Sequence, residues 1–100
     1  MRVWEYGRLY VARASKHGVW TYSAYFVEAG AEPYYFYDKV NDLDDQPGQI
    51  EILNSIGLDG WELVSVTLQN ASYQESGTNT PYESWRLKEH TFKREVQKAD

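Results

Sequence analysis

The feature that most constrains this chain is a change of hydrophobic periodicity around two glycines, in the stretch LNSIGLDGWELVSVTLQ at residues 53–69. Before the glycines, apolar residues recur three and four positions apart, which predicts an amphipathic helix. After Gly60, a run rich in Val, Leu and Thr that begins at Trp61 is typical of a strand. The chain must leave a helix and enter a strand within a few residues. We therefore expect Gly57 to end the helix in a left-handed conformation and Gly60 to adopt a positive φ.

The predicted helix begins in the preceding segment NDLDDQPGQ. Pro47 suits the first turn of a helix, where a missing N–H costs nothing, and Asp44 and Asp45 suit the positive end of the helix dipole. Ile52 and Ile56 lie four residues apart and would face the same side. We expect this side of the helix to pack on the core.

The first forty residues predict strands. Residues 3–13 and 18–28 are rich in Val, Tyr, Trp and Phe, and the segment ASKHG between them suits the loop of a β-hairpin. The segment YYFYDKV at 34–40 is a further strand, and Pro33 at its start favours the edge of a sheet.

The strand that starts at Trp61 predicts two faces. Strict alternation places Val64, Val66 and Leu68 on one apolar face and Leu63 on the other, together with Trp61. We expect Trp61 to lie in the core, and Trp4, which also begins a strand, to lie there too.

The C-terminal third is less clear from its pattern. The polar segment NASYQESGTNTP at 70–81 predicts a loop. Residues 82–100 are rich in Lys, Glu and Arg, which favours a helix, while the aromatic residues among them favour a strand. The local pattern does not decide between the two.

One domain spanning residues 1–100 fits this length and the hydrophobic content of 42%. The chain contains no cysteine, which excludes disulfides and thiolate chemistry, and it contains no apolar run long enough to span a membrane. We expect a cytoplasmic protein without membrane contact. The predicted fold class is α+β, with a mainly antiparallel sheet of about five strands and one helix packed on it.

Three short motifs together suggest a family. The chain reads WEY at residues 4–6, then LNSIGLDGWELVSV at 53–66, and FKR at 92–94. In this order the motifs resemble the bacterial and phage family called domain of unknown function 4177. The resemblance implies a fold in which FKR ends the last strand, so we expect residues around 84–95 to join the sheet. It implies no catalytic residues, and the aromatic segment at about 11–41 replaces the shorter linker of that family.

The acidic cluster that precedes the helix is a poor calcium site. Asp42, Asp44 and Gln46 match the first three ligand positions of a calcium-binding loop. Pro47 stands where that loop needs glycine, however, and Leu53 stands where it needs glutamate. We therefore expect no metal site here.

Other catalytic signals are also missing from the sequence. His17 and His90 have no partner at metal-ligand spacing, and no glycine-rich phosphate loop or nucleophile elbow is present. We expect no cofactor, and the question of an enzyme stays open, leaning towards none. Glu62 of GWEL is expected to cap backbone amides or to pair with Lys93 or Arg94 of the last strand.

Two groups of residues are candidates for binding. The formal net charge of −5 disfavours nucleic acid, but the segment from Arg86 to Lys98 holds five basic and only two acidic residues. The candidate anion patch comprises Arg86, Lys88, Lys93 and Arg94. Aromatic rings with polar tips are common at interfaces, and they crowd the segment that the family lacks. The candidate interface or ligand contacts are Trp20, Tyr22, Tyr34, Tyr35 and Tyr37.

These observations predict a small non-enzymatic binding or regulatory module, and the family resemblance implies that a phage encodes it. One short helix is too small to cover a five-stranded sheet, so the sheet curls on itself, loops pack over it, or a partner supplies the missing layer. We expect the partner, which would be a second copy of the chain or another protein. The alternative is a small-molecule binding protein. It would hold a nucleotide-like or aromatic ligand with the aromatic segment and the basic C-terminal strand.

Overall fold

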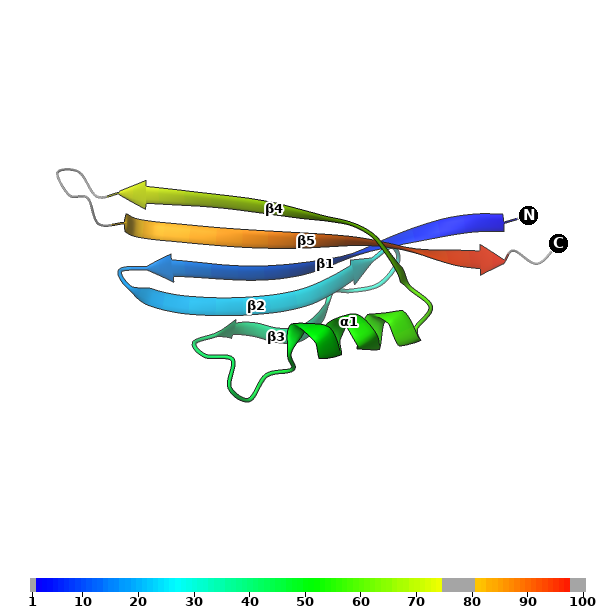
Figure 1. Cartoon of the computed structure of the whole chain (residues 1–100), viewed down its shortest axis with the longest axis horizontal. Coiled ribbons are helices and arrows are strands. Elements are labelled where there is room, and N and C mark those ends of the chain that lie inside the picture. Colours follow the sequence, from blue (N-terminus) through cyan, green and yellow to red (C-terminus); the bar gives the residue numbers. More distant parts are fainter. Residues whose placement is uncertain (1, 75–80, 98–100) are drawn as a thin grey trace.

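The computed structural model describes residues 2–74 and 81–97, and the side chains of residues 3–71 and 84–96. It contains one antiparallel sheet in the order β3-β2-β1-β5-β4, with a single helix on one face (Figure 1). The molecule is elongated, with extents of 64 × 28 × 21 Å. In chain order the elements are β1 (Arg2–Lys16), β2 (Val19–Glu28), β3 (Tyr34–Val40), α1 (Gln49–Leu58), β4 (Glu62–Gln74) and β5 (Pro81–Gln97).

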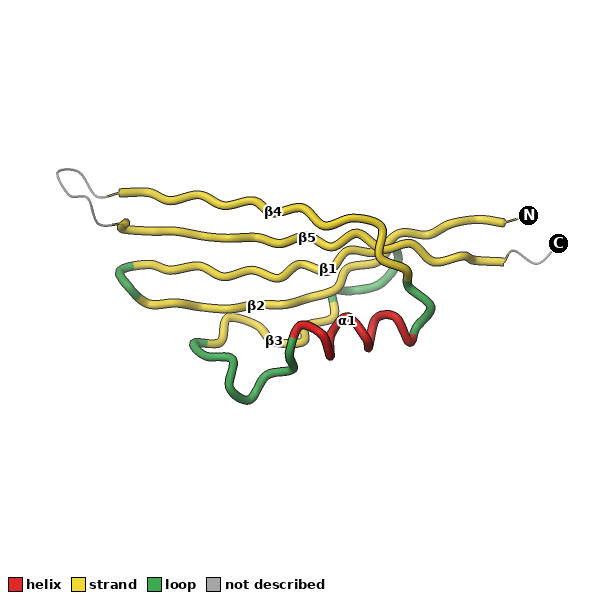
Figure 2. The backbone as a smooth tube through the Cα atoms, viewed as in Figure 1, coloured by secondary structure: helices red, strands yellow, loops and turns green. Residues whose placement is uncertain are grey.

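The predicted α+β class, the five strands and the N-terminal hairpin are confirmed. The C-terminal segment is a strand, β5, which lies between β1 and β4 (Figure 2). The loop predicted at 70–81 is wrong in its first part, because β4 continues to Gln74. Polar residues of 70–74 extend the edge strand, since pairing with β5 satisfies their backbone. Residues 75–80 lie outside the described residues.

Of the two predictions made for the glycines between helix and strand, the one for Gly60 is confirmed and the one for Gly57 is wrong. Gly60 has a φ of 88°, as the short passage from helix to strand requires. Gly57 does not end the helix, which continues to Leu58, and Asp59 follows as the C-cap. Pro47 lies before the N-cap, Gly48, so the helix begins two residues later than predicted and Asp44 and Asp45 lie outside its first turn.

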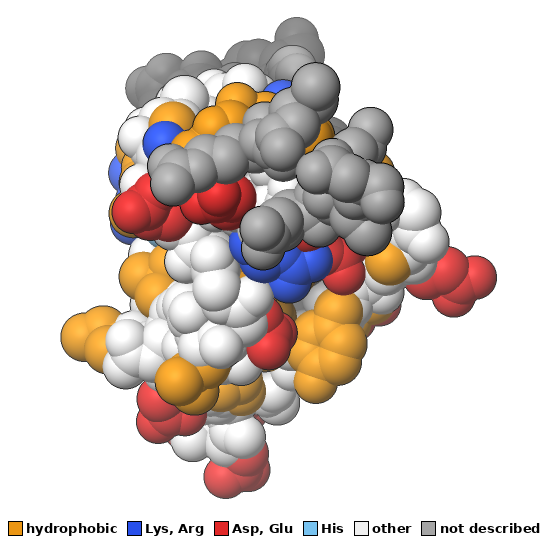
Figure 3. Space-filling view, turned by 90° about the vertical axis from the view of Figure 1, so that its right-hand side faces the viewer, with side chains coloured by type: hydrophobic (Ala, Val, Ile, Leu, Met, Phe, Trp, Pro, Cys, Tyr) orange, Lys and Arg blue, Asp and Glu red, His pale blue; other side chains and the backbone are white. Residues whose placement is uncertain are grey.

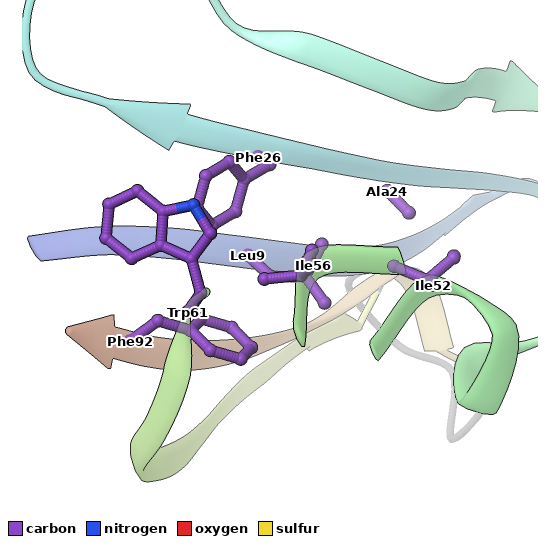
Figure 4. Packing of buried hydrophobic residues seen from close by; sticks show 7 residues of the cluster. All are labelled: Leu9, Ala24, Phe26, Ile52, Ile56, Trp61 and Phe92. Carbon is purple, nitrogen blue, oxygen red and sulfur yellow. The ribbon is translucent and has the colours of Figure 1, made fainter. Parts of the chain in front are cut away.

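The core lies between α1 and the sheet near the chain termini (Figure 4). Ile52 and Ile56 of the helix are buried against Leu9, and Trp61 packs edge-on to Phe26 with ring centroids 5.3 Å apart. The buried hydrophobic residues are Leu9, Ala24, Phe26, Ile52, Ile56, Trp61 and Phe92.

Close packing here depends on a residue without a side chain. Gly7 is buried in β1, and a Cβ atom at this position would collide with the ring of Phe26. Phe26 in turn packs edge-on to Phe92 across the sheet, with ring centroids 6.0 Å apart. The glycine therefore makes room for the aromatic cluster beneath the helix.

A β-bulge in β4 changes the predicted faces of this strand. Leu63 pairs with Phe92, but the next paired residue is Ser65, which leaves Val64 unpaired at the register shift. Beyond it, Val66 pairs with His90 and Leu68 pairs with Lys88. Cross-strand partners share a face, so Leu63, Val66 and Leu68 lie on the face that carries the helix. The prediction that Val64, Val66 and Leu68 form one face with Leu63 on the other is therefore wrong, because alternation fails at a bulge.

Candidate functional site

The five candidate aromatic residues do not share one surface. Trp20 and Tyr22 face the helix side, since they pair with Ser15 and Arg13 in register with the residues under the helix. Tyr34 and Tyr37 lie toward the same side on β3, where the ring of Tyr34 meets that of Phe36. Tyr35 lies on the opposite face, in a ladder with Tyr25 and Tyr10 whose successive ring centroids are 5.2 and 5.1 Å apart. Burial and the two neighbouring tyrosines raise the pKa of Tyr25.

The candidate anion patch is also divided. Arg94 lies over the ring of Trp61, with its guanidinium carbon 4.2 Å from the ring centroid. Its Nε donates to Glu5 at 2.6 Å, and its Nη1 donates to the carbonyl of Asp59 at 3.1 Å. A second carboxylate, that of Glu28, lies 3.7 Å from Nη2 of Arg94. Arg94 therefore closes the end of the core and is already neutralised.

Lys93 points to the other face of the sheet. Its Nζ lies 4.4 Å from the centroid of the Trp4 ring and 3.9 Å from Glu62. The predicted pairing of Glu62 is thus confirmed, with Lys93 as the partner. The prediction that Trp4 lies in the core is wrong, because its ring remains 44% exposed on the face without a helix.

Arg86 and Lys88 are brought together with the aromatic segment. They line a cavity of about 270 Å³ that also contains Tyr22, Tyr37 and Arg13. Sequence reasoning missed Arg13, because only the register of β1 with β5 places it directly opposite Arg86. The sequence carries no local signal for this register, so nothing in it pointed to Arg13. The cavity lies beyond the first turn of α1, whose Gln49 is also in its lining.

His90 lies between this cavity and the core. It is buried in β5, and its Nε2 lies 3.4 Å from the side-chain nitrogen of Gln49. Burial lowers the pKa of His90, and the positive charge of Lys88 lowers it further. His17 lies in the turn between β1 and β2. In the described part of the chain, no three His, Asp or Glu side chains gather so as to hold a metal ion.

The edge strand β4 is exposed along both of its faces. Every residue from Glu62 to Asn70 is exposed. Leu63, Val66 and Leu68, on the helix side, retain 49%, 44% and 51% of their surface. Glu62 is the only charged residue of the strand. Beyond the bulge at Val64 the strand is apolar on the helix side and carries no charge, and such an edge readily pairs with another strand.

The opposite edge, β3, is protected. Its pairing with β2 shifts register twice, and Lys39 at its end has a positive φ of 49°. Asp38 and Lys39 contact Ser23 of β2 through the serine hydroxyl, at 3.5 and 2.9 Å. Charges at an edge discourage further strand addition, and this edge carries two in seven residues, whereas β4 carries one in thirteen. The two edges therefore offer very different opportunities for binding.

The face of the sheet opposite the helix carries its own charge pairs. Arg8 lies 3.3 Å from Glu89, and Lys93 lies over Trp4 beside Glu62. At the end of the molecule where the termini lie, hydrophobic side chains are interspersed with acidic ones (Figure 3). These arrangements fit surfaces that face water. The described helix is not long and apolar enough to cross a membrane.

Comparison with known proteins gives no match, whether to a family model, to a curated protein or to a solved structure. The resemblance to domain of unknown function 4177 therefore stays a prediction. Functional inference depends on the geometry of this chain.

Proposed function

We propose that this protein is a non-enzymatic binding module that associates through its edge strand β4, in the first instance with a second copy of itself. The observation that carries the proposal is the exposure of β4, with a half-exposed apolar row on one face and one charge in thirteen residues. Strand addition at such an edge supplies backbone hydrogen bonds, and the apolar row supplies contacts between side chains.

A second copy fits this edge because the strand is complementary to itself. In an antiparallel pair centred on Thr67, Val66 of one copy lies opposite Leu68 of the other, and the reverse pair repeats on the other side of the axis. The two apolar rows then meet on the same face, because a two-fold axis perpendicular to the sheet keeps both helices on one side. Glu62 is far from the axis, so no like charges oppose one another near the centre.

The size of the contact predicts how firmly the copies associate. Regular pairing centred on Thr67 covers residues 65–69, which follow the bulge at Val64, and extends for about 17 Å along the strand, at about 3.4 Å per residue. A strip of this length and one strand in depth is smaller than a standard interface. We therefore expect a reversible dimer whose population rises with protein concentration.

The test is light scattering of the protein over a concentration series, with the variant Leu68→Lys. The parent protein should rise above the monomer mass of 11.7 kDa as concentration increases. The variant should remain monomeric and folded, because a lysine in the apolar row opposes pairing. Leu58→Lys makes the same change at a helix residue that is 89% exposed and should leave association unchanged.

Two outcomes contradict the proposal. One is a parent protein that stays at the monomer mass at high concentration. The other is a dimer that survives Leu68→Lys but is lost in Tyr35→Glu, which alters the opposite face. That second result would transfer association to the tyrosine ladder.

A further inference from the structure

The cavity beside the first turn of α1 combines cations and aromatic rings in a regular array. Across the helix face of β2, β1 and β5, Tyr22, Arg13 and Arg86 occupy one row of directly paired positions. The next row toward the core holds Ala24, Val11 and Lys88, and Tyr37 of β3 is paired with Ala24. The buried alanine leaves space between the tyrosines and the cations. This arrangement forms the cavity of about 270 Å³.

The three cations are close together and lack counter-charges. Directly opposed residues of an antiparallel pair have Cβ atoms about 5 Å apart, so Arg13 and Arg86 begin side by side. Lys88 follows Arg86 by two residues, about 7 Å along the same face. Among the described residues, no carboxylate forms an ion pair with any of the three. Like charges placed opposite each other destabilise a sheet, and an anion between them would remove that cost.

The contrast with the other basic residues of β5 makes this point specific. Lys93 and Arg94 each have carboxylate partners within 4 Å. Arg13 lies over the ring of Trp20, with its guanidinium carbon 5.5 Å from the ring centroid. In a chain with a net charge of −5, three cations that have no ion pair with any described carboxylate thus surround one hollow.

We propose that this cavity binds a small phosphomonoester that carries a ring, such as a nucleoside monophosphate. Arg13 and Arg86 donate to the phosphate oxygens in the bidentate geometry that guanidinium favours, and Lys88 adds a third charge. Tyr22 and Tyr37 contact the ring. This binding site is independent of the proposed pairing through β4.

The size and rim of the cavity favour a small ligand over a nucleic acid. Its volume lies near the lower limit of ligand pockets, about 300 Å³. Leu43 lines the hollow, and the exposed Asp42 and Asp44 flank it in the chain. Negative charge in this segment opposes the approach of a polyanion. One phosphate can reach the cations without placing further phosphates near these aspartates.

The test is isothermal titration of the full chain with adenosine 5′-monophosphate, adenosine and inorganic phosphate as separate probes. The monophosphate should bind saturably and more tightly than either of the other two. Arg13→Gln and Arg86→Gln should each weaken its binding about ten- to a hundredfold, because each removes charge-assisted hydrogen bonds. Arg8→Gln makes the same change on the opposite face and should alter binding by less than about twofold.

Several results would overturn the inference. One is the absence of saturable binding of the monophosphate at millimolar concentration. Another is an equal loss of affinity in Arg8→Gln and Arg86→Gln, which would indicate only general charge attraction. If adenosine binds as tightly as its monophosphate, the cations do not contribute to binding. If inorganic phosphate binds as tightly as the monophosphate, the tyrosines do not contribute. Binding of an oligonucleotide that strengthens with its length would replace the small ligand by nucleic acid. Circular dichroism of each variant verifies its fold.

Discussion

The helix face of the sheet has two halves, formed by the same strands, that differ in burial and in charge: one is an apolar core beneath α1, and the other is an open cavity lined by cations and tyrosines. In the covered half, Leu9 of β1 lies beneath Ile52 and Ile56 of the helix. Only four residues further along β1, Arg13 lies in an open cavity with Arg86. The strands β2, β1 and β5 therefore carry both the buried core and the cationic cavity, within about 14 Å of each other.

Element lengths explain this difference. A helix of ten residues is about 15 Å long, whereas a strand of fifteen residues such as β1 extends for about 50 Å. One helix can cover only part of the face, and the remainder must be polar or find another partner. In this chain the residues change from leucine and phenylalanine to arginine and tyrosine where the helix begins. The position of α1 along the sheet therefore determines where the core ends and where the cationic cavity begins.

The largest expected effect is in the covered half. Trp61→Ala should lower the free energy of unfolding by about 3–5 kcal/mol, because Trp61 is buried against Phe26 and beneath Arg94. Leu68→Ala, in the uncovered part of β4, should cost less than about 1 kcal/mol, since half of its surface already faces water. Urea denaturation of both variants measures the two values. Equal losses would mean that the two regions are not energetically distinct.

The passage from helix to strand should come next. Gly60→Val should destabilise the protein by about 1–3 kcal/mol, because its φ of 88° strains a β-branched residue. The strain is in the backbone, since a Cβ would approach Arg94 only to an ordinary 3.5 Å. Gly57→Val, inside the helix, is the matched control and should have a smaller effect. The same denaturation experiment decides between strain and simple crowding: a larger loss at Gly57 would contradict the assignment of strain to Gly60.

A third prediction concerns the boundary between the halves, where His90 is buried. Its pKa is lowered in the folded state, so the unfolded chain binds the proton more readily. Stability is therefore highest above the ordinary His pKa of 6.5, where the imidazole is neutral in both the folded and the unfolded state. It decreases as the pH falls below 6.5 toward the lowered pKa of the folded state, because the unfolded chain takes up the proton first.

Thermal denaturation between pH 8 and pH 5 measures this dependence. The parent protein should lose stability over the acid part of the range, and His90→Gln should have a flatter profile. An unchanged slope in His90→Gln would show that other groups govern the acid response.

The sequence predicted elements with strong local signals and failed where the tertiary arrangement decides. The switch at Gly60 and the burial of Trp61 followed from periodicity and backbone sterics. The faces of β4 did not, because a bulge at Val64 depends on how the strand meets β5 and has no clear local signature. Trp4 was misplaced because a strand position alone does not state which face the helix covers.

The same limit applies to the candidate site. Four basic residues of β5 formed one patch in sequence, but their alternation separates Lys93 from the others, and the core engages Arg94. Arg86 and Lys88 remain, and Arg13 joins them through pairing between residues more than seventy positions apart. Long-range register of this kind cannot be deduced from residue type, and a single sequence does not specify it.

The smallest expected effect tests the uncovered half in the absence of ligand. Arg86→Gln should raise the stability of the free protein by a few tenths of a kcal/mol, on the order of a cross-strand pair, because Arg13 then has no like charge opposite it. Arg8→Gln removes a cation that has a partner in Glu89 at 3.3 Å and should be neutral or slightly destabilising. Both variants change the net charge equally, so its effect cancels in the difference between them. Melting temperatures at low ionic strength should therefore move in opposite directions, and the difference should diminish with added salt because these residues are exposed to solvent. If Arg86→Gln instead lowers the melting temperature as Arg8→Gln does, the two arginines are not in electrostatic conflict. The cost that makes an anion favourable between them would then be absent, even if the cavity retains its shape.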